Sequence, residues 1–264
     1  MLSKLIKHEW KDTWRMPAGL MLVLALLTVI GIFIGSDMGN FLEASFDSNV
    51  SGVLTGLYFF SYVIVVCFST FAIWIYFILR FKNNMYGTEA YLMHSLPVSA
   101  SEHIASKTIV NLIWTILSAL GVLTSIAVFI LSHAGDIDWS MFLADVSDFL
   151  NYFREEIEYV TDLPFPLAMV LFIFIGLFSS ISRILVIYLS ISIGQQVKKH
   201  KTLLSFVSFF LILYVEGKGF IMLSDLLDLD APFGFVVLLI LEIAVSVLYF
   251  ACNSLLMSRR LNLE

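Results

Sequence analysis

Six long apolar blocks with few charges follow one another along this chain of 264 residues. A helix needs about 20 mostly apolar residues to cross the hydrocarbon core of a bilayer, and most of the blocks reach that length. The pattern predicts an all-α polytopic membrane protein with six transmembrane helices in a single membrane domain, and it leaves little room for a soluble domain. The predicted spans cover residues of about 18–35, 53–79, 106–132, 164–193, 202–223 and 233–257.

The composition agrees with lipid as the solvent of most side chains. Hydrophobic residues make up 59% of the chain and charged residues only 14%, whereas soluble proteins average about 25% charged residues. Cys67 and Cys252 both lie inside apolar blocks. We therefore interpret them as small buried residues and not as a disulfide or as metal ligands.

The charges are sorted by side of the membrane. The loops assigned to one side hold Arg154 and Lys218 together with most of the acidic residues, Glu216 among them, and the termini and the alternate loops hold nearly all the other basic residues. Basic loops mark the cytoplasmic side, so we expect both termini in the cytoplasm. The basic residues on that side are Lys4, Lys7, Lys11, Arg15, Arg80, Lys82, Lys107, Lys198, Lys199, Lys201, Arg259 and Arg260.

Two short patterns concern the first span and the residues before it. Residues 2–15 place apolar and Trp side chains on one face and lysines on the other, which predicts an amphipathic helix in the membrane interface. Pro17 then marks the turn into the span. Gly31 and Gly35 form a small-xxx-small motif, which lets two helices approach closely and suggests helix packing or dimerisation there.

The fifth block is interrupted. Residues 202–215 are apolar, but the sequence EGKGF follows at 216–220 before apolar residues resume. Two interpretations remain open: a segment that re-enters the outer half of the membrane, or an ordinary tilted span that ends near Leu223. The residues from 134 to 163, which precede the fourth span, are rich in acids and are interpreted as a long outer loop.

Two ionisable residues fall inside predicted spans. Glu242 lies ~14 Å along the sixth span, close to the midplane, so we expect it to line a pathway or to bond to a neighbouring helix. Arg183 lies ~28 Å along the fourth span, where its side chain can reach the inner interface. With both helices starting at the same level, Arg183 would be too far towards the cytoplasm to pair with Glu242.

Motifs for ATP binding, zinc proteolysis and serine hydrolysis are absent from the sequence: it has no G-x-x-x-x-G-K-[ST], no H-E-x-x-H and no G-x-S-x-G. We therefore expect no catalytic residues, no metal and no cofactor in this chain, and no nucleic-acid partner. The amphipathic segment between the second and third spans carries more information.

That segment, NNMYGTEAYLMHSLPVSASEHIASK at residues 83–107, predicts a short cytoplasmic helix. Thr88 can cap it and Pro97 ends it, and Ser99 with Glu102 forms a capping box that opens the next helix. Its aromatic and Leu side chains have few local partners, which favours contact with another protein. Packing of the segment against the domain's own cytoplasmic face is the alternative.

The part GTEAYLMHSLPVSASEHIASK resembles a segment of bacterial type-2 ABC transporter permeases, and the whole plan of the chain is similar to theirs. The resemblance implies that the short helix is a coupling helix, which docks onto a separate ATP-binding subunit. It also implies export across the bacterial cell membrane, with a second permease chain, identical or different, completing the pathway. The residues implied in docking are Tyr86, Glu89, Tyr91, Leu92, His94 and Ser95.

A rival interpretation is an ATP-independent membrane protein, either a secondary carrier or an intramembrane enzyme. The substrate does not follow from the resemblance. Peptide-like molecules, lipids and other hydrophobic compounds all fit it.

Overall fold

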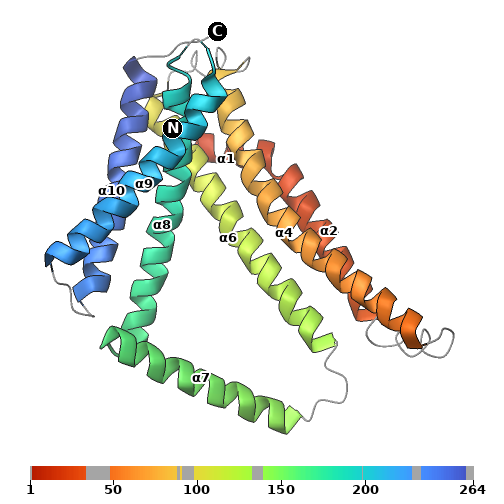
Figure 1. The fold of residues 1–264 in the computed structure, drawn as a ribbon. Helices are drawn as coiled ribbons and strands as arrows, with labels where there is room; N and C mark the ends of the chain where they lie inside the picture. Colours follow the sequence, from red (N-terminus) through yellow and green to blue (C-terminus); the bar gives the residue numbers. More distant parts are fainter. Residues whose placement is uncertain are drawn as a thin grey trace. The chain divides into compact units, whose positions relative to one another are not determined.

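The computed structural model describes residues 2–33, 48–87, 90, 98–132, 139–197, 199–227 and 233–259. Within these ranges the regular structure is helical, as predicted (Figure 1). The helices are α1 (Leu2–Thr13), α2 (Arg15–Phe33), α4 (Ser48–Tyr86), α6 (Ala100–Ser132), α7 (Trp139–Thr161), α8 (Phe165–Gly194), α9 (Lys201–Leu227) and α10 (Phe233–Arg259).

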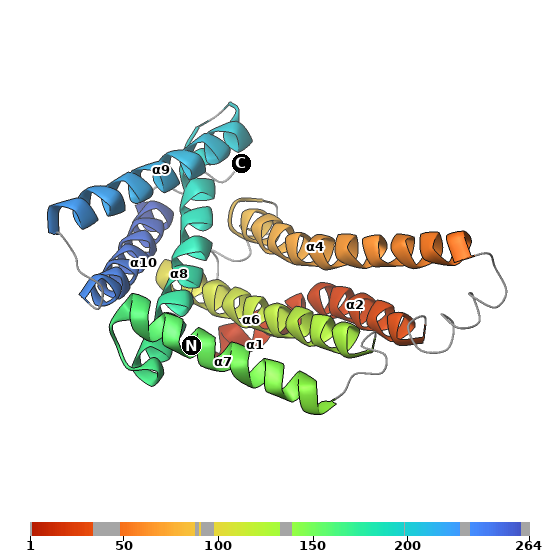
Figure 2. The same cartoon turned by 60° about the horizontal axis from the view of Figure 1, so that its bottom comes forward.

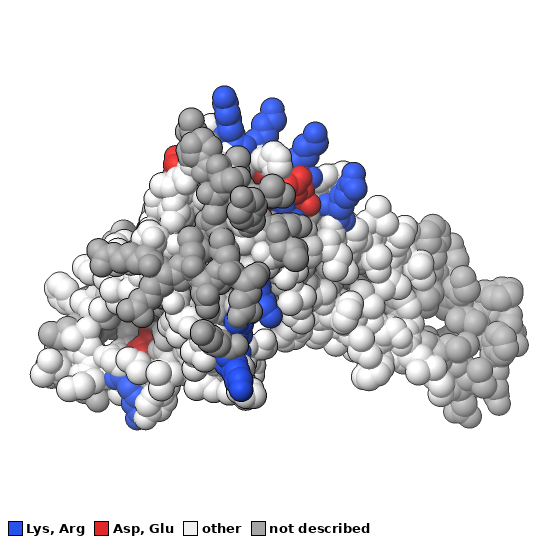
Figure 3. Space-filling model, turned by 90° about the horizontal axis from the view of Figure 1, so that it is seen from above, with Lys and Arg blue, Asp and Glu red and all other residues white. Residues whose placement is uncertain are grey.

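Six of these helices are long and apolar enough to cross a membrane, namely α2, α4, α6, α8, α9 and α10. They coincide with the six predicted spans, so the chain is an all-α, multi-pass membrane protein. Large apolar side chains such as Phe60, Phe68 and Phe71 are more than 60% exposed along them, which in water would be an unusually large apolar surface. On the face drawn in Figure 3, charged atoms take up only a small part of the described surface.

The helices that flank the amphipathic segment are longer than a bilayer requires. α4 has 39 residues and α6 has 33, which correspond to ~58 Å and ~50 Å at 1.5 Å per residue. The predicted capping box at the start of α6 is confirmed. The Ser99 backbone N–H donates to Glu102 Oε2 at 3.2 Å, and the Glu102 N–H donates to Ser99 Oγ at 3.3 Å.

The chain divides into two compact units, and residues 7–77 and 113–142 form one of them. In this unit the Tyr58 hydroxyl donates to the Leu27 carbonyl at 2.6 Å, and its ring lies where a Cβ on Gly31 would be. Gly31 is therefore the point at which α2 admits a side chain of α4. The buried hydroxyl of Ser125 on α6 bonds to Thr28 of α2 and Tyr62 of α4, each at 2.6 Å.

The predicted amphipathic helix is α1, and its Trp10 stacks on Trp114 of α6 with ring centroids 4.8 Å apart. Trp14 remains 47% exposed. The bonds from Trp14 N–H to the Trp10 carbonyl and from Ala18 N–H to the Trp14 carbonyl continue helical geometry into α2. Pro17 therefore lies in the first turn of α2, where its missing N–H costs little.

Residues 1–6, 78–112 and 143–264 form the other unit, whose core joins the end of α4, the start of α6, the second half of α8 and the end of α10. Phe81 and Tyr188 stack at its centre with ring centroids 3.8 Å apart. Met85, Ile104 and Val186 are fully buried around them. The ends of α4 and α6 that border the amphipathic segment thus belong to the main buried core of this unit.

α7 corrects the prediction of a long outer loop before the fourth span. Twenty-three residues of that region form one helix. Apolar side chains recur along it at helical spacing on one face, and its five carboxylates and one arginine lie outside that face. The apolar residues on that face are Phe142, Val146, Phe149, Leu150, Phe153, Ile157 and Val160.

Hydrogen bonds stabilise the turn between α7 and α8, and the two helices meet there at a steep angle (Figure 1). Asp162 has φ 53°, a left-handed conformation that Asp tolerates better than most residues. The Phe165 N–H donates to Glu158 Oε1 at 3.0 Å, and Arg154 pairs with the same oxygen at 3.2 Å. These two contacts, the backbone one first, lower the pKa of Glu158 below its usual value.

α9 decides between the two interpretations of the fifth block. It continues as one helix from Lys201 to Leu227, and 24 of its residues, up to Ser224, qualify as a span. The described residues therefore form an ordinary span and not a re-entrant segment. Glu216 and Lys218 lie within this helix, so assigning them to an outer loop was wrong. A Cβ at Gly217 or Gly219 would meet no atom within 4 Å.

The turn between α8 and α9 depends on a glycine. A Cβ on Gly194 would collide with the Ser205 side chain and lie 2.6 Å from the Lys201 carbonyl oxygen. The end of α8 therefore approaches the first turn of α9 more closely than any other residue would permit. α8 also packs along α10, so it contacts both of the following spans (Figure 2).

Candidate functional site

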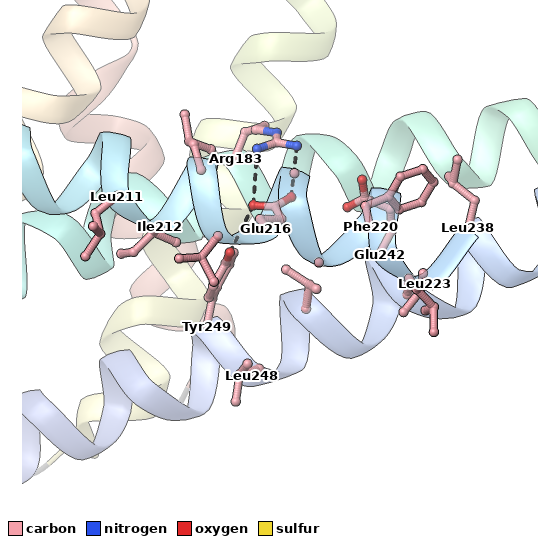
Figure 4. A pocket seen from close by; sticks show the side chains of 16 residues that line it. Arg183, Leu211, Ile212, Glu216, Phe220, Leu223, Leu238, Glu242, Leu248 and Tyr249 are labelled. Atoms are coloured by element: carbon pink, nitrogen blue, oxygen red, sulfur yellow. Dashed lines mark hydrogen bonds and ion pairs between the residues drawn. The ribbon is translucent and has the colours of Figure 1, made fainter. Parts of the chain in front are cut away.

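A cavity of about 800 Å³ opens where α8, α9 and α10 meet. Leu, Ile, Val and Phe side chains of α9 and α10 form most of its wall, as Figure 4 shows. Four polar side chains also line it: Arg183 of α8, Glu216 of α9, and Glu242 and Tyr249 of α10. A mostly apolar cavity of this size with a few polar groups is typical of a small-molecule site.

An ion pair joins α8 to α9 at this cavity. Arg183 Nη2 donates to Glu216 Oε1 at 3.0 Å, and Nη1 donates to Oε2 at 3.3 Å. The Tyr249 hydroxyl donates to the same Oε2 at 2.9 Å, so α10 joins the cluster (Figure 4). The charge of Glu216 is therefore paired with that of Arg183, and both of its carboxylate oxygens accept hydrogen bonds. A carboxylate inside a membrane protein requires such partners.

The ion pair corrects the interpretation of Arg183 as a residue that reaches out to the inner interface. Its guanidinium is bound bidentately by Glu216, and the Glu216 side chain is only 15% exposed. Sequence reasoning missed this partner because Glu216 had been assigned to a loop. Once α9 is continuous, Glu216 lies about 22 Å along it from Lys201, well inside the span.

Glu242 bonds across a helix pair, which is one of the roles expected for it, and its side chain also lines the cavity. The Ser182 hydroxyl donates to Glu242 Oε2 at 2.9 Å. Among the described residues, the other oxygen, Oε1, has no hydrogen-bond partner. The carboxylate group is thus held at one oxygen and available at the other.

This bond also corrects the expected offset between the fourth and sixth spans. Ser182 lies 17 residues after the start of α8 and Glu242 lies 9 residues after the start of α10. The two residues are at the same level, so α8 begins about 12 Å before α10, measured along the helices. Arg183 and Glu242 therefore line one cavity, although equal starting levels would have separated them.

A chain of polar side chains connects the cavity to the end of α4. The Tyr86 hydroxyl donates to Ser192 Oγ at 2.8 Å, and the Ser192 hydroxyl lies 3.3 Å from Asn253 Oδ1. Asn253 Nδ2 donates to the carbonyls of Leu185 and Tyr249 at 3.0 Å and 2.9 Å. Tyr249 then reaches Glu216 through its own hydroxyl. α4, α8, α9 and α10 are linked by this set.

Of the residues implied in docking, Tyr86 is within the described chain. It is 8% exposed, so the expectation that the chain could not bury it is wrong, and its position suits orienting the following segment. Glu89, Tyr91, Leu92, His94 and Ser95 lie outside the described residues, as does Gly35. Gly31 lies in the unit that does not contain the cavity, against Tyr58.

Sequence reasoning named Glu242 as a candidate site residue but missed Arg183, Glu216 and Tyr249 at the cavity and Asn253 next to it. Tyr249 and Asn253 are four residues apart and so share a face of α10, a signal that was readable from spacing. Their partners on α8 and α9 were not readable, because helix register is a property of the folded chain.

The site suits the binding of a small molecule. Within the described ranges, no three His, Cys, Asp or Glu residues come together as a metal site would require. What the geometry defines is a multi-pass helical membrane protein with a polar cluster in an apolar cavity between three spans. Comparisons of the chain with protein-family models, with curated proteins and with solved structures found no match.

Proposed function

We propose that this chain is the membrane-spanning permease subunit of an ABC exporter in the bacterial cell membrane. It moves a hydrophobic or peptide-like substrate by alternating access, and a separate ATP-binding subunit supplies the energy. Both termini are cytoplasmic, and a second permease chain, identical or different, completes the pathway. The proposal rests first on the resemblance of residues 87–107 to the segment that contains the coupling helix.

The single observation that supports it best is the anchoring of that segment. α4 enters it from a buried core through Met85 and Tyr86, and α6 leaves it through the Ser99–Glu102 capping box and buried Ile104. A docking element transmits force only when the helices at its ends are rigidly held. Here both ends belong to one packed unit.

The hydrogen-bonded side chains from Tyr86 to Glu216 connect the anchored end of α4 to the cavity, so movement at one can be transmitted to the other. A push on the end of α4 acts directly on Ser192 of α8 and, through Asn253, on α10. Those helices also line the cavity. A continuous set of packed and hydrogen-bonded groups of this kind can couple two sites when it has two discrete arrangements. Docking and substrate binding would then bias the same equilibrium.

The direct test is copurification of an ATP-binding subunit with the full chain in mild detergent. Interface energy is concentrated in a few aromatic and large apolar anchors. The double change Tyr91→Ala with Leu92→Ala should therefore weaken the association by over a hundredfold, since ~3 kcal/mol corresponds to about two decades in affinity. Membrane insertion should be unchanged, because no span is altered.

The matched control is Tyr152→Ala with Leu150→Ala, which removes the same two side-chain types from the exposed surface of α7. It should leave the association intact. If the first double variant still copurifies its ATP-binding subunit stoichiometrically and still transports, residues 91 and 92 are not the docking element.

The alternative, an ATP-independent carrier, is favoured by a specific observation. An intramembrane ion pair and a further carboxyl at a cavity are features through which ion-coupled carriers bind their ions. Transport by the purified chain alone, driven by an ion gradient without nucleotide, would establish it. ATP-dependent transport that requires the second subunit would exclude it.

A further inference from the structure

Charge balance in the cavity shows which ligands it suits. Two carboxylates, Glu216 and Glu242, face one guanidinium, Arg183, among the described lining residues. Arg183 gives both of its terminal nitrogens to Glu216. Among the described residues, Glu242 therefore has a hydroxyl donor at one oxygen and no cation partner. Charged groups in a membrane protein are normally paired with one another.

The rest of the cavity wall is apolar, so it suits a ligand whose larger part is apolar. Phe220 and Leu223 of α9 face it together with Leu238, Leu241 and Leu248 of α10. A volume of about 800 Å³ is large enough for a drug-sized molecule. Figure 4 shows the Glu242 carboxyl apart from the Arg183–Glu216 pair, so a ligand can reach it without displacing Arg183.

We propose that this cavity binds lipophilic molecules that carry a protonated amine. The amine pairs with Glu242 Oε1, and the apolar part lies along α9 and α10. This names the substrate class of the proposed permease and in that sense rests on the proposed function. An anionic ligand is disfavoured because Glu242 repels it while Arg183 is already paired, and a neutral ligand leaves Glu242 without a counter-ion.

The test uses the full chain in nanodiscs of phosphatidylcholine, without nucleotide or a second subunit. Three photoreactive probes share one diazirine-bearing dodecyl chain and differ in the head group: primary amine, alcohol or carboxylate. Crosslinked peptides are identified by mass spectrometry, and dodecylamine is the competitor. We expect the amine probe to label the cavity-lining parts of α9 and α10 saturably, at a concentration about tenfold below that of the alcohol, because charge-assisted hydrogen bonds are the stronger ones.

Glu242→Gln keeps the shape of the side chain and removes its charge, so it should abolish the preference for the amine over the alcohol. Glu156→Gln is the matched control, because Glu156 is an exposed carboxylate of α7 outside the cavity. It should leave the preference unchanged. Leu238→Trp, which fills the cavity, should lower labelling by the amine and the alcohol alike and gives a second test should Glu242→Gln not fold.

Equal labelling by amine and alcohol in the unchanged chain overturns the proposal. So does a preference that survives Glu242→Gln, or saturable labelling that maps away from the cavity and persists in Leu238→Trp. None of these outcomes bears on the ATP-binding subunit. If the amine binds as expected and no such subunit copurifies, the binding site stands and the permease function falls.

Discussion

Glu216 is the residue on which the three cavity helices depend most directly. Its carboxylate accepts two hydrogen bonds from Arg183 and one from Tyr249. Removing one partner of a buried ion pair leaves an uncompensated charge, whereas removing both partners does not. The effects of substituting Glu216 and Arg183 on stability should therefore be strongly non-additive.

Glu216→Gln alone should lower the free energy of unfolding by about 3 kcal/mol or more, because Arg183 loses its counter-ion. Adding Arg183→Gln should recover most of that loss. Thermal unfolding in detergent, arranged as a double-mutant cycle, measures both effects. Arg154→Gln breaks a pair that is exposed on α7 and should lower the free energy of unfolding much less, because water screens the attraction between exposed charges. A double variant whose loss equals the sum of the losses in Glu216→Gln and Arg183→Gln would show that the pairing contributes nothing.

At the scale of the residue, sequence reasoning placed Arg183 and Glu242 inside spans, but it missed Glu216 as an intramembrane charge and did not identify the partners of these groups. Glu242 was recognisable from its depth in an apolar block. The partner of Arg183 was hidden because glycines and charges at 216–219 suggested the end of a helix. In the folded chain α8 and α10 satisfy Glu216, and a helix tolerates such residues when neighbours do this.

At the scale of the element, α7 is an amphipathic helix with much of its apolar face exposed. Phe149 and Leu150 of that face are each more than half exposed. Helices with one apolar and one charged face lie in the membrane interface. α7 joins two spans, α6 and α8, so both of its ends emerge on the same side of the membrane.

We expect nitroxide labels along residues 142–157 in nanodiscs to alternate in accessibility with helical period. A label at Phe149 or Phe153 should be relaxed by lipid-soluble oxygen, and a label at Asp148 or Glu155 by a water-soluble nickel chelate. Uniform exposure to the nickel chelate at all positions would place the whole helix in water and contradict this orientation.

The sequence contained the signal for α7, since its apolar residues recur every three to four positions. Its five acids outweighed that signal and led to the prediction of a loop. By contrast, the six spans were predictable in number and approximate position, because length and apolar content indicate whether a segment can cross a bilayer. The capping box at Ser99 was predictable for a similar reason, since its partners are three residues apart.

At the scale of the whole molecule, the placement of both termini in the cytoplasm rests on the distribution of Lys and Arg. In a background without Cys67 and Cys252, a cysteine at Asp148 should react in intact cells with an impermeant thiol reagent. A cysteine at Ser101 should react only after the cells are permeabilised. Reaction at 101 and not at 148 in intact cells would reverse the orientation.

The charge of α7 has a consequence for how such a molecule enters the membrane. Its five carboxylates and one arginine must all cross the bilayer during insertion if the termini stay inside. A membrane potential that is negative inside favours outward movement of negative charge by about 2.3 kcal/mol per charge per 100 mV. The electric field thus assists the outward translocation of α7. Collapsing the potential during synthesis should therefore slow this translocation. A variant of α7 whose acids are replaced by amides should be slowed less.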